Sequence, residues 1–546
     1  MTTTDPPRVY RGPLPDIDVP DCTLYELLFA GLTGEDAAKT AVVDDASGVR
    51  LTFGQVRAQV DAAASWLAAR GIGPGDVAAV FLPNGPDYLA AFHGIARSGA
   101  AATPINAGYT AHEVARQLAE TSARLIVTCP ALLDQAAPAA AEAGLTPADV
   151  LVTGGPGDPA AIAAGGHTAW SAVLATPAAP PDLDVDPATH VACLPFSSGT
   201  AGLPKPVRLS HRNLVANLLQ FNEVLRPLGG DASLVAFLPY SHIYALTTNL
   251  NYGLFRRCAQ YPLAGFDPSR FLGIIARHRP ALLFVVPPVA AFLARHPAVA
   301  RADLSSLRLI VSGAAPLDGA VGRALQERLG VRVIQGYGMT ELSPVTHVIP
   351  IDRTDIDLGT IGQAIPNVRF RVVEPDTGVD VPAPEPGAVS RPGELWCTGP
   401  NAMLGYLGAP EADAVLDADG WVHTGDLVTV DAEGVVRIVD RIKELIKRRG
   451  MQVAPAELEA VLCAHPAVAD AAVLGVDTRT PGDQVPYALV QLREGAEATA
   501  SELMNWVAER VAQHKRLGGL HVVARVPRSA AGKILRRELP ALLPPR

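Results

Sequence analysis

The sequence predicts an α/β protein whose sheets are largely parallel. Segments with helical periodicity alternate with short apolar segments, as in Gln55–Ala69 followed by Val77–Leu82, and this alternation is typical of βαβ units. Aliphatic residues are abundant, whereas aromatic residues make up only 5% of the chain, as expected for strands buried on both faces. A chain of 546 residues is too long for one core, so several folding units are expected.

The predicted elements follow the chain in two α/β stretches. In residues 20–130 the helix-like segments are Leu24–Leu32, Gln55–Ala69 and Tyr88–Gly99, and the strand-like segments are Ala41–Val43, Val77–Leu82 and Leu125–Thr128. From residue 190 to about residue 350 the predicted strands are His190–Leu194, Leu234–Leu238, Leu282–Val286, Leu307–Val311 and Val331–Gln335. Residues 131–181, rich in Ala, Gly and Pro, predict one helix and a loose connection.

The pattern changes twice in the C-terminal part. Between Arg353 and Gly434 short strands and turns predict a small β subdomain or barrel, with strands at Val368–Val373, Gly393–Cys397 and Gly434–Arg441. Residues 442–546 have a higher charge density and the length of a compact α+β unit.

Charge and cysteine usage exclude several classes of protein. The net charge is −10 and no basic tract is present, so a nucleic-acid partner is not expected. The six cysteines are too far apart for a Cys-x-x-Cys pair, so we expect no zinc site, no disulfide framework and a reducing cytoplasm. The longest apolar run, Ala281–Ala294, is too short to span a bilayer. A cytoplasmic monomer or homodimer without a membrane span is expected.

The loop Phe196–Lys205 indicates phosphate binding. It reads Phe-Ser-Ser-Gly-Thr-Ala-Gly-Leu-Pro-Lys and lies between a predicted strand and a helix-like segment from His211 to Leu219. Its glycines let backbone N–H groups approach an anion, its hydroxyls add donors, and Lys205 adds a positive charge. The spacing is not that of a Walker A loop. The alternative for this segment taken alone, a polar surface loop between strand and helix, is disfavoured.

Four further clusters carry chemistry. They are Gln335-Gly-Tyr-Gly-Met-Thr-Glu341, Gly420-Trp-Val-His-Thr-Gly-Asp426, Asp440-Arg-Ile-Lys-Glu-Leu-Ile-Lys-Arg-Arg-Gly-Met-Gln452 and Pro527-Arg-Ser-Ala-Ala-Gly-Lys533. Singly, they could be a strand-to-helix turn, a β-turn, a solvated helix face and a terminal loop. Only six of the 45 basic residues are lysines, and four of these lie in the loop and these clusters. A compact ammonium is therefore expected to matter there.

In this order, the motifs resemble the adenylate-forming superfamily of acyl-CoA synthetases, luciferases and peptide-synthetase adenylation domains. The resemblance covers residues 20–540, and within it the 4-coumarate:CoA ligase group matches best, on His242-Ile-Tyr244, Ser312-Gly-Ala-Ala-Pro316 and Lys443-Glu-Leu-Ile-Lys447. It implies an N-terminal domain (1–440) of two α/β subdomains and a small β-barrel, and a mobile C-terminal lid (441–546). It also implies that a carboxylate attacks Mg-ATP to give an acyl-adenylate, after which the thiol of coenzyme A displaces AMP.

The resemblance assigns the site residues. Catalytic roles fall to Lys533, Thr340 and His242. The residues assigned to ATP or AMP are Ser197, Ser198, Gly199, Thr200, Lys205, Ala314, Gln335, Gly336, Tyr337, Thr340, Asp426, Arg441, Lys443, Lys447, Gln452 and Lys533. Those assigned to CoA are Arg449 and Gly450, and Glu341 is assigned to magnesium. The acyl group is assigned to His242, Tyr244, Thr248, Gly338, Pro344 and Val345.

The expected acid is aryl or cinnamic in type, such as 4-coumarate. Gly338 is expected to leave room for a flat ring, and no acidic residue lies in Tyr240–Tyr244 to pair an ammonium, which disfavours an amino acid. Cinnamate, coumarate, benzoate-like and medium-chain acids all stay open.

Departures from the family pattern affect both half-reactions, and those at Pro206, Arg448 and Arg449 leave the acceptor open. Ala201 and Pro206 stand where the family loop has threonine and glycine, and Arg449 stands where it has lysine. The adenylate could therefore pass to CoA, or to an amine or a carrier-protein thiol. A non-catalytic ligand-binding relative is the third hypothesis, and the intact Lys533, Thr340 and Glu341 disfavour it.

Overall fold

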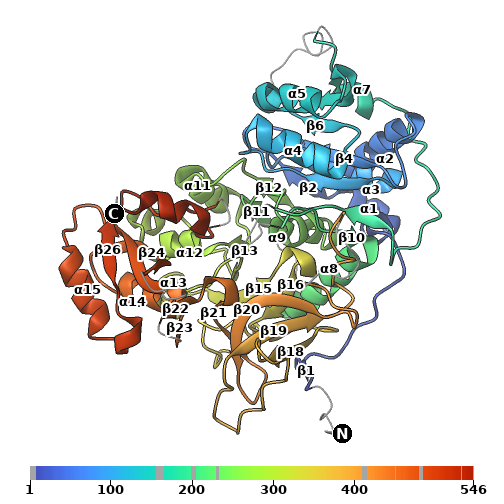
Figure 1. Cartoon of the computed structure of the whole chain (residues 1–546). Coiled ribbons are helices and arrows are strands. Elements are labelled where there is room, and N and C mark those ends of the chain that lie inside the picture. The colour runs from blue at the N-terminus through green and yellow to red at the C-terminus, as the bar shows by residue number, and fades with distance from the viewer. Residues whose placement is uncertain are drawn as a thin grey trace.

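The molecule contains two large sheets that are mostly parallel, one antiparallel sheet and a smaller C-terminal unit (Figure 1). The computed structural model describes residues 8–154, 165–197, 204–228, 233–408, 415–448, 451–478, 484–529 and 532–544. Helices and strands alternate through the first two thirds of the chain. The predicted α/β class is therefore confirmed.

A seven-stranded sheet has the order β10-β9-β5-β4-β6-β7-β8, in which only β10 and β9 pair antiparallel. Its strands are β4 (Val77–Val80), β5 (Ala101–Pro104), β6 (Ile126–Thr128), β7 (Val150–Val152), β8 (Thr168–Ala169), β9 (Val191–Cys193) and β10 (Leu209–Ser210). Its helices are α2 (Phe53–Ala69), α3 (Pro86–Ser98), α4 (Ala111–Thr121), α5 (Leu133–Glu142) and α7 (Trp170–Leu174).

Alternation along β4 explains how both faces of this sheet are covered. Ala78 and Val80 belong to the core that includes α2 and α3, whereas Ala79 and Phe81 belong to the core that includes α4 and α5. Successive side chains of a strand point to opposite faces, so two helix layers are required. Thr52 starts α2 by a capping box with Gln55.

The prediction for residues 131–181 is wrong in part. The expected helix is α5, but the expected loose connection contains β7, β8 and α7. The apolar run of β7 is only three residues long, too short for a periodicity to stand out from its Ala-rich surroundings.

A nine-stranded sheet has the order β17-β16-β15-β14-β13-β11-β12-β2-β3. Its strands are β2 (Thr40–Val43), β3 (Arg50–Thr52), β11 (Leu234–Ala236), β12 (Gln260–Pro262), β13 (Leu282–Val285), β14 (Leu309–Ser312), β15 (Arg332–Gly338), β16 (Val345–Val348) and β17 (Gln363–Ala364). The helices are α1 (Gly34–Ala38), α8 (His211–Leu225), α9 (Ile243–Ala245), α10 (Tyr252–Phe255), α11 (Pro268–His278), α12 (Pro287–Arg295) and α13 (Gly319–Leu329). Six neighbouring strands of this sheet run parallel: β15, β14, β13, β11, β12 and β2.

The β subdomain is a five-stranded antiparallel sheet in the order β1-β18-β19-β20-β21. Its strands are β18 (Arg369–Val373), β19 (Gly393–Thr398), β20 (Val422–Val430), β21 (Val436–Arg441) and, from the start of the chain, β1 (Tyr10–Arg11). Tyr10 is opposite Phe370, and their rings stack with centroids 4.9 Å apart. This strand was not predicted from the sequence.

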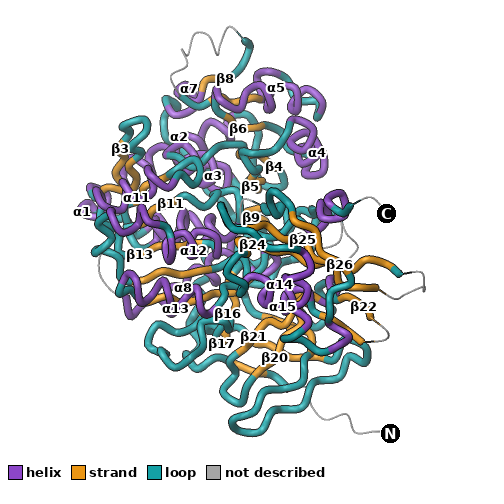
Figure 2. Tube along the Cα trace, turned by 90° about the vertical axis from the view of Figure 1, so that its left-hand side faces the viewer, coloured by secondary structure: helices purple, strands orange, loops and turns teal. Residues whose placement is uncertain are grey.

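The C-terminal unit has its own apolar core, which begins at Ile446. It consists of the hairpin strands β22 (Ile446–Arg448) and β23 (Met451–Val453), the sheet β24 (Val468–Asp477), β25 (Gln484–Leu492) and β26 (Gly519–Val522), and helices α14 (Pro455–Cys463) and α15 (Ala500–Ala508). Figure 2 views the molecule from the side of this unit. A separate core is what a separate folding unit would have, and the division of the chain near residue 440 stays a prediction.

Two findings concern the described residues alone. None of their helices has both the length and the apolar character needed to cross a bilayer. Among them, no three His, Cys, Asp or Glu side chains are grouped so that they could hold a metal ion.

Candidate active site

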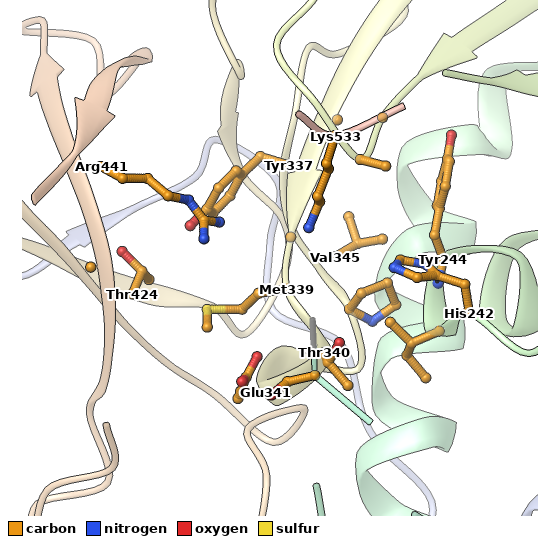
Figure 3. Close-up of a pocket in the computed structure, with 18 of the residues that line it drawn as sticks. His242, Tyr244, Tyr337, Met339, Thr340, Glu341, Val345, Thr424, Arg441 and Lys533 are labelled. Carbon is orange, nitrogen blue, oxygen red and sulfur yellow. The ribbon is translucent and has the colours of Figure 1, made fainter. Parts of the chain in front are cut away.

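A cavity of about 380 Å³ lies at the carboxyl ends of the parallel strands β14 and β15 (Figure 3). Open α/β sheets bind ligands at this edge. Its walls come from distant segments: the helical turn Thr340–Leu342 after β15, the start of α9, strands β20 and β21, and the C-terminal loop that carries Lys533. The cavity therefore joins both parts of the chain.

One polar wall is built by Tyr337, Asp426 and Arg441. Asp426 on β20 is directly opposite Arg441 on β21, and Arg441 Nε lies 2.9 Å from Asp426 Oδ1. The Tyr337 hydroxyl donates to Asp426 Oδ2. Burial opposes the charge of Arg441, but Asp426 and Tyr337 outweigh this effect and raise its pKa. A buried carboxylate is thus paired with a guanidinium beside the cavity.

A second polar wall is built by Glu341, Tyr406 and Lys205. The Tyr406 hydroxyl donates to Glu341 Oε1 over 2.7 Å, and Lys205 Nζ lies 4.8 Å from the centre of the Tyr406 ring. Glu341 is only 5% exposed. Both walls combine a carboxylate with a cation, an arrangement suited to a polyanion accompanied by a metal ion.

Lys533 enters between the two ends of the cavity. Figure 3 shows its side chain reaching down between Tyr337 and Arg441 on one side and His242 and Tyr244 on the other. The turn that carries it is tight, because Ser529 N donates to Lys533 O over 2.8 Å and Lys533 N donates to Ser529 Oγ over 3.2 Å. The backbone at Lys533, from which the side chain extends, therefore has a defined position.

Burial lowers the pKa of Lys533 to about 8. The nearby guanidinium of Arg441 contributes to this lowering of the pKa, while Asp426, Glu341 and Glu444 oppose it. Perturbed pKa values of this size cluster at functional sites. The position of Lys533 and its lowered pKa thus both indicate a functional residue.

The opposite end of the cavity is apolar. Phe221, Ile243, Val311 and Val345 line it, and the Tyr244 hydroxyl there donates to Val311 O over 3.2 Å. Burial lowers the pKa of His242 to about 3, and the charge of Lys533 adds to this shift. The imidazole is therefore neutral, and this end presents no charged side chain among the described residues that line it.

Backbone positions shape the apolar wall. Asn217 of α8 donates from Nδ2 to Val345 O over 2.7 Å and accepts from Val345 N over 3.0 Å. A Cβ atom on Gly338 would lie 2.1 Å from Pro344 O. Gly338 is thus required by the close approach of two backbone segments, and not only by the room that a ring needs, as the sequence suggested.

Comparison with protein families identifies the chain. Residues 33–407 match the family described as AMP-binding enzyme, and residues 457–533 match the AMP-binding enzyme C-terminal domain. The chain belongs to this adenylate-forming family. The predicted resemblance and the predicted enzyme class, an AMP-forming acid–CoA ligase, are confirmed.

Relatives in sequence include two named 4-coumarate–CoA ligases. The chain is 37% identical to 4-coumarate–CoA ligase 5 of Oryza sativa subsp. japonica, over 98% of this chain and 97% of that protein. It is 33% identical to 4-coumarate–CoA ligase 4 of Arabidopsis thaliana, over 98% and 94%.

Solved structures of this adenylate-forming family have the same fold. ATP-bound MatB from Rhodopseudomonas palustris has a TM-score of 0.85 at 29% identity, over 96% of this chain and 99% of that one. The amide bond synthetase McbA from Marinactinospora thermotolerans has a TM-score of 0.80 at 26% identity, over 95% and 99%.

Most of the residues assigned by resemblance line one cavity of this adenylate-forming enzyme. They are Ser197, Lys205, His242, Tyr244, Ala314, Gly336, Tyr337, Gly338, Thr340, Glu341, Pro344, Val345, Arg441, Lys443 and Lys533. Asp426 joins them through its bonds to Tyr337 and Arg441. Residues up to 336 positions apart in sequence are thus brought together, as between Ser197 and Lys533.

Besides Asp426, three assigned residues with described side chains lie outside the lining. The Thr248 hydroxyl is buried and donates to Tyr244 O over 2.8 Å, one helical turn back. Gln335 donates to Thr360 O over 2.6 Å and accepts from Leu317 N, so its side chain holds two loops together. Lys447 is exposed on β22.

Some assignments fall on residues that the structure does not describe. These are Ser198, Gly199, Thr200, Arg449 and Gly450, as well as Ala201 among the departures. For Gln452 only the backbone, in β23, is described.

Several lining residues were not assigned from the sequence: Tyr406, Glu394, His423, Thr424, Met339 and Phe221. Thr424, His423 and Met339 lie inside quoted motifs, so the signal was present. Glu394 accepts from Gly425 N over 2.9 Å. Tyr406 lies in no motif that the sequence analysis singled out.

Proposed function

We propose that this enzyme activates a monocarboxylic acid with a neutral, flat body, of the cinnamic type such as 4-coumarate, and transfers it to CoA. The observation that carries the proposal is the position of Lys533 between a polar end and an apolar end of one cavity. An ammonium at this junction can contact the acid carboxylate and the α-phosphate of ATP together.

In the proposed first step, a carboxylate oxygen attacks the α-phosphorus of ATP and the bond to pyrophosphate breaks. Both reactants are anions, so fixed positive charge is needed between them. Lys533 would bridge the carboxylate and the α-phosphate, and Lys205 would hold the leaving phosphates. Asp426 would accept hydrogen bonds from the ribose hydroxyls, exchanging them for the bond from Tyr337.

The donor set fits a magnesium ion that travels with ATP. Magnesium is usually held by one or two carboxylates together with substrate phosphates and water. Glu341 supplies one carboxylate, whose Oε1 is bonded to Tyr406, and Thr340 supplies a hydroxyl beside it. When bound, such an ion would neutralise charge on the phosphates; the residues of the chain would orient them.

The apolar end supports a neutral acyl group. A second carboxylate or an ammonium placed against Phe221, Ile243 and Val311 would be buried without a partner among the described lining residues, which is costly. The names of the sequence relatives favour a cinnamic acid over an alkyl acid of similar volume.

The second step requires that the Lys533 ammonium leave its position, so that the thiol of CoA can reach the acyl-adenylate. We infer that residues 441–546 act as a lid that turns near Asp440 and withdraws Lys533, in accordance with the separate core of this unit. The sulfur of CoA then attacks the acyl carbonyl and AMP leaves with the electron pair of the broken bond. His242, which is neutral while Lys533 occupies the cavity, would lie beside the acyl carbonyl.

The test is pyrophosphate release over a panel of aryl and alkyl acids with ATP and magnesium, with and without CoA. Lys533→Ala should abolish release. Lys515→Ala is the matched control, because Lys515 belongs to the same unit but pairs with Glu457 at the surface. A CoA thioester of a cinnamic acid, identified by mass, is the expected product. No release with any acid would contradict the proposal.

A second acceptor is suggested by the likeness to an amide bond synthetase. An amine would attack the same carbonyl in place of the thiol. Release of pyrophosphate without a thioester, and an amide when an amine is added, would favour this alternative over CoA.

A further inference from the structure

A short segment, residues 401–407, lies beside both phosphate-facing elements of the cavity. Towards the turn Thr340–Leu342, Asn401 Nδ2 donates to Leu342 O over 2.7 Å and Met403 N donates to Glu341 O over 2.9 Å. Towards the end of the loop that contains Lys205, Leu407 N donates to Pro206 O over 2.9 Å. The segment therefore ties two elements that are far apart in sequence.

Tyr406 is the side chain of this segment that touches a charge on each element. Its hydroxyl donates to Glu341 Oε1 over 2.7 Å, and Lys205 Nζ lies 4.8 Å from its ring centre. Tyr406 is 7% exposed and lines the cavity. Its backbone pairs with Val207 in an antiparallel bridge, so the backbone from which the ring extends is held in place.

The side chains of Lys205, Glu341 and Tyr406 differ in flexibility. Lysine has a long, flexible stem with high rotamer entropy, and a glutamate carboxylate can rotate. A tyrosine has only two side-chain torsions, and here its hydroxyl, its ring face and its backbone are all engaged. A cation over the ring face and a carboxylate at the hydroxyl are both favourable contacts.

We propose that Tyr406 is a positioning residue that holds the Glu341 carboxylate and the Lys205 ammonium at a preset separation, matched to the phosphates of ATP and their metal ion. This inference rests on the proposed function of the cavity. It assigns the two contacts to different tasks: the hydroxyl orients the carboxylate that meets the metal, and the ring orients the ammonium that meets phosphate.

Two variants separate the tasks. Tyr406→Phe removes the hydroxyl and keeps the ring, and Tyr406→Leu removes both. Tyr25→Phe is the matched control, because the Tyr25 hydroxyl donates to Asp61 Oδ1 over 2.6 Å, also a phenol-to-carboxylate bond, away from the cavity. The probe is ATP, and calorimetry measures its dissociation constant with and without MgCl₂.

For Tyr406→Phe we expect metal-free ATP binding within about threefold of the unchanged protein, and about tenfold weaker binding in MgCl₂, the size expected for a lost hydrogen bond to a charged group. For Tyr406→Leu we expect metal-free binding to weaken as well, by about threefold to tenfold, as the cation–ring contact is lost. Tyr25→Phe should match the unchanged protein.

A double-mutant cycle tests whether Tyr406 acts through Glu341. In Glu341→Gln, adding Tyr406→Phe should leave ATP binding in MgCl₂ unchanged, because the carboxylate that the Tyr406 hydroxyl orients is no longer present. Additive losses, or equal dissociation constants for all Tyr406 variants and the unchanged protein, would overturn the inference. Since ATP binding is measured without an acid, failure to find a substrate would contradict the proposed function but not this inference.

Discussion

The lowered pKa of Lys533 makes the first half-reaction dependent on pH in a range where an ordinary lysine would not titrate. The ammonium form is the one that can bridge two anions. Its pKa is lowered from 10.5 to about 8, a difference of ~3 kcal/mol between the two protonation states. We therefore expect kcat/KM for pyrophosphate release to fall about tenfold per pH unit above pH 8.

The groups around Lys533 set the sign of the effect. Burial and Arg441 favour the neutral amine, and the carboxylates Asp426, Glu341 and Glu444 oppose them only in part. Because kcat/KM reports the free enzyme, its decline should begin near pH 8. Bound ATP adds negative charge beside the ammonium, so the decline in kcat should begin at a higher pH.

The same lowered pKa affects stability. The folded protein binds the proton of Lys533 less tightly than the unfolded chain does, so the lowered pKa by itself raises the free energy of unfolding as pH rises from 8 to 10.5.

The assay is the exchange of labelled pyrophosphate into ATP, with cinnamate as the acid and without CoA. Cinnamate has no phenol and the exchange uses no thiol, so neither the acid nor an acceptor titrates in this range, and the last ionisation of pyrophosphate affects the unchanged protein and its variants alike. Lys533→Arg keeps its charge at every pH tested, so it should be slower and should lack the additional decline that begins near pH 8 in the unchanged protein. A profile that is flat for the unchanged protein, or that declines equally in Lys533→Arg, would refute the reasoning.

Three further predictions follow from the walls of the cavity. Gly338→Ala places a methyl group against Pro344 O and should lower the midpoint of thermal unfolding, with a loss of ~1–3 kcal/mol; an unchanged midpoint would contradict the close approach. Asn217→Ala leaves Val345 N without its partner and Val345 O with only the 3.4 Å bond from Asn401 Nδ2, and it should broaden acid selectivity while lowering stability by ~1–3 kcal/mol, measured over the acid panel and by urea unfolding. Arg528 pairs with Asp470 and donates from Nη1 to Gly532 O over 2.7 Å, so Arg528→Ala frees the turn that carries Lys533 and should lower kcat of pyrophosphate exchange at least fivefold with the dissociation constant of ATP unchanged; equal loss of binding would show a wider disruption.

The sequence was most informative where function lies in contiguous motifs. Gln335–Glu341 follows a buried strand, and parallel strands end at a common edge, so their side chains could be expected near one another. Lys533 stood out because lysine is rare in this chain. Its place between the two ends of the cavity could come only from the family resemblance, since the lysine belongs to a different folding unit.

The residues that hold the motifs in place could not be predicted in the same way. Tyr406 contacts Glu341 across 65 positions, and Asn217 contacts Val345 across 128. Contacts of this kind depend on the packing of whole elements and leave no local periodicity in the sequence. The close approach of Gly338 to the backbone at Pro344 could not be predicted for the same reason, because it is visible only in three dimensions.

The strand β1 has a consequence for the order of events during synthesis. It leaves the ribosome well before its partner Phe370, which is made 360 residues later. At about 5–20 residues per second, Tyr10 would wait about 20–70 seconds for the strand on which it stacks. The β subdomain therefore closes late, around a segment that has been available since the beginning. The nascent chain must keep that segment out of other pairings until the sheet that needs it exists.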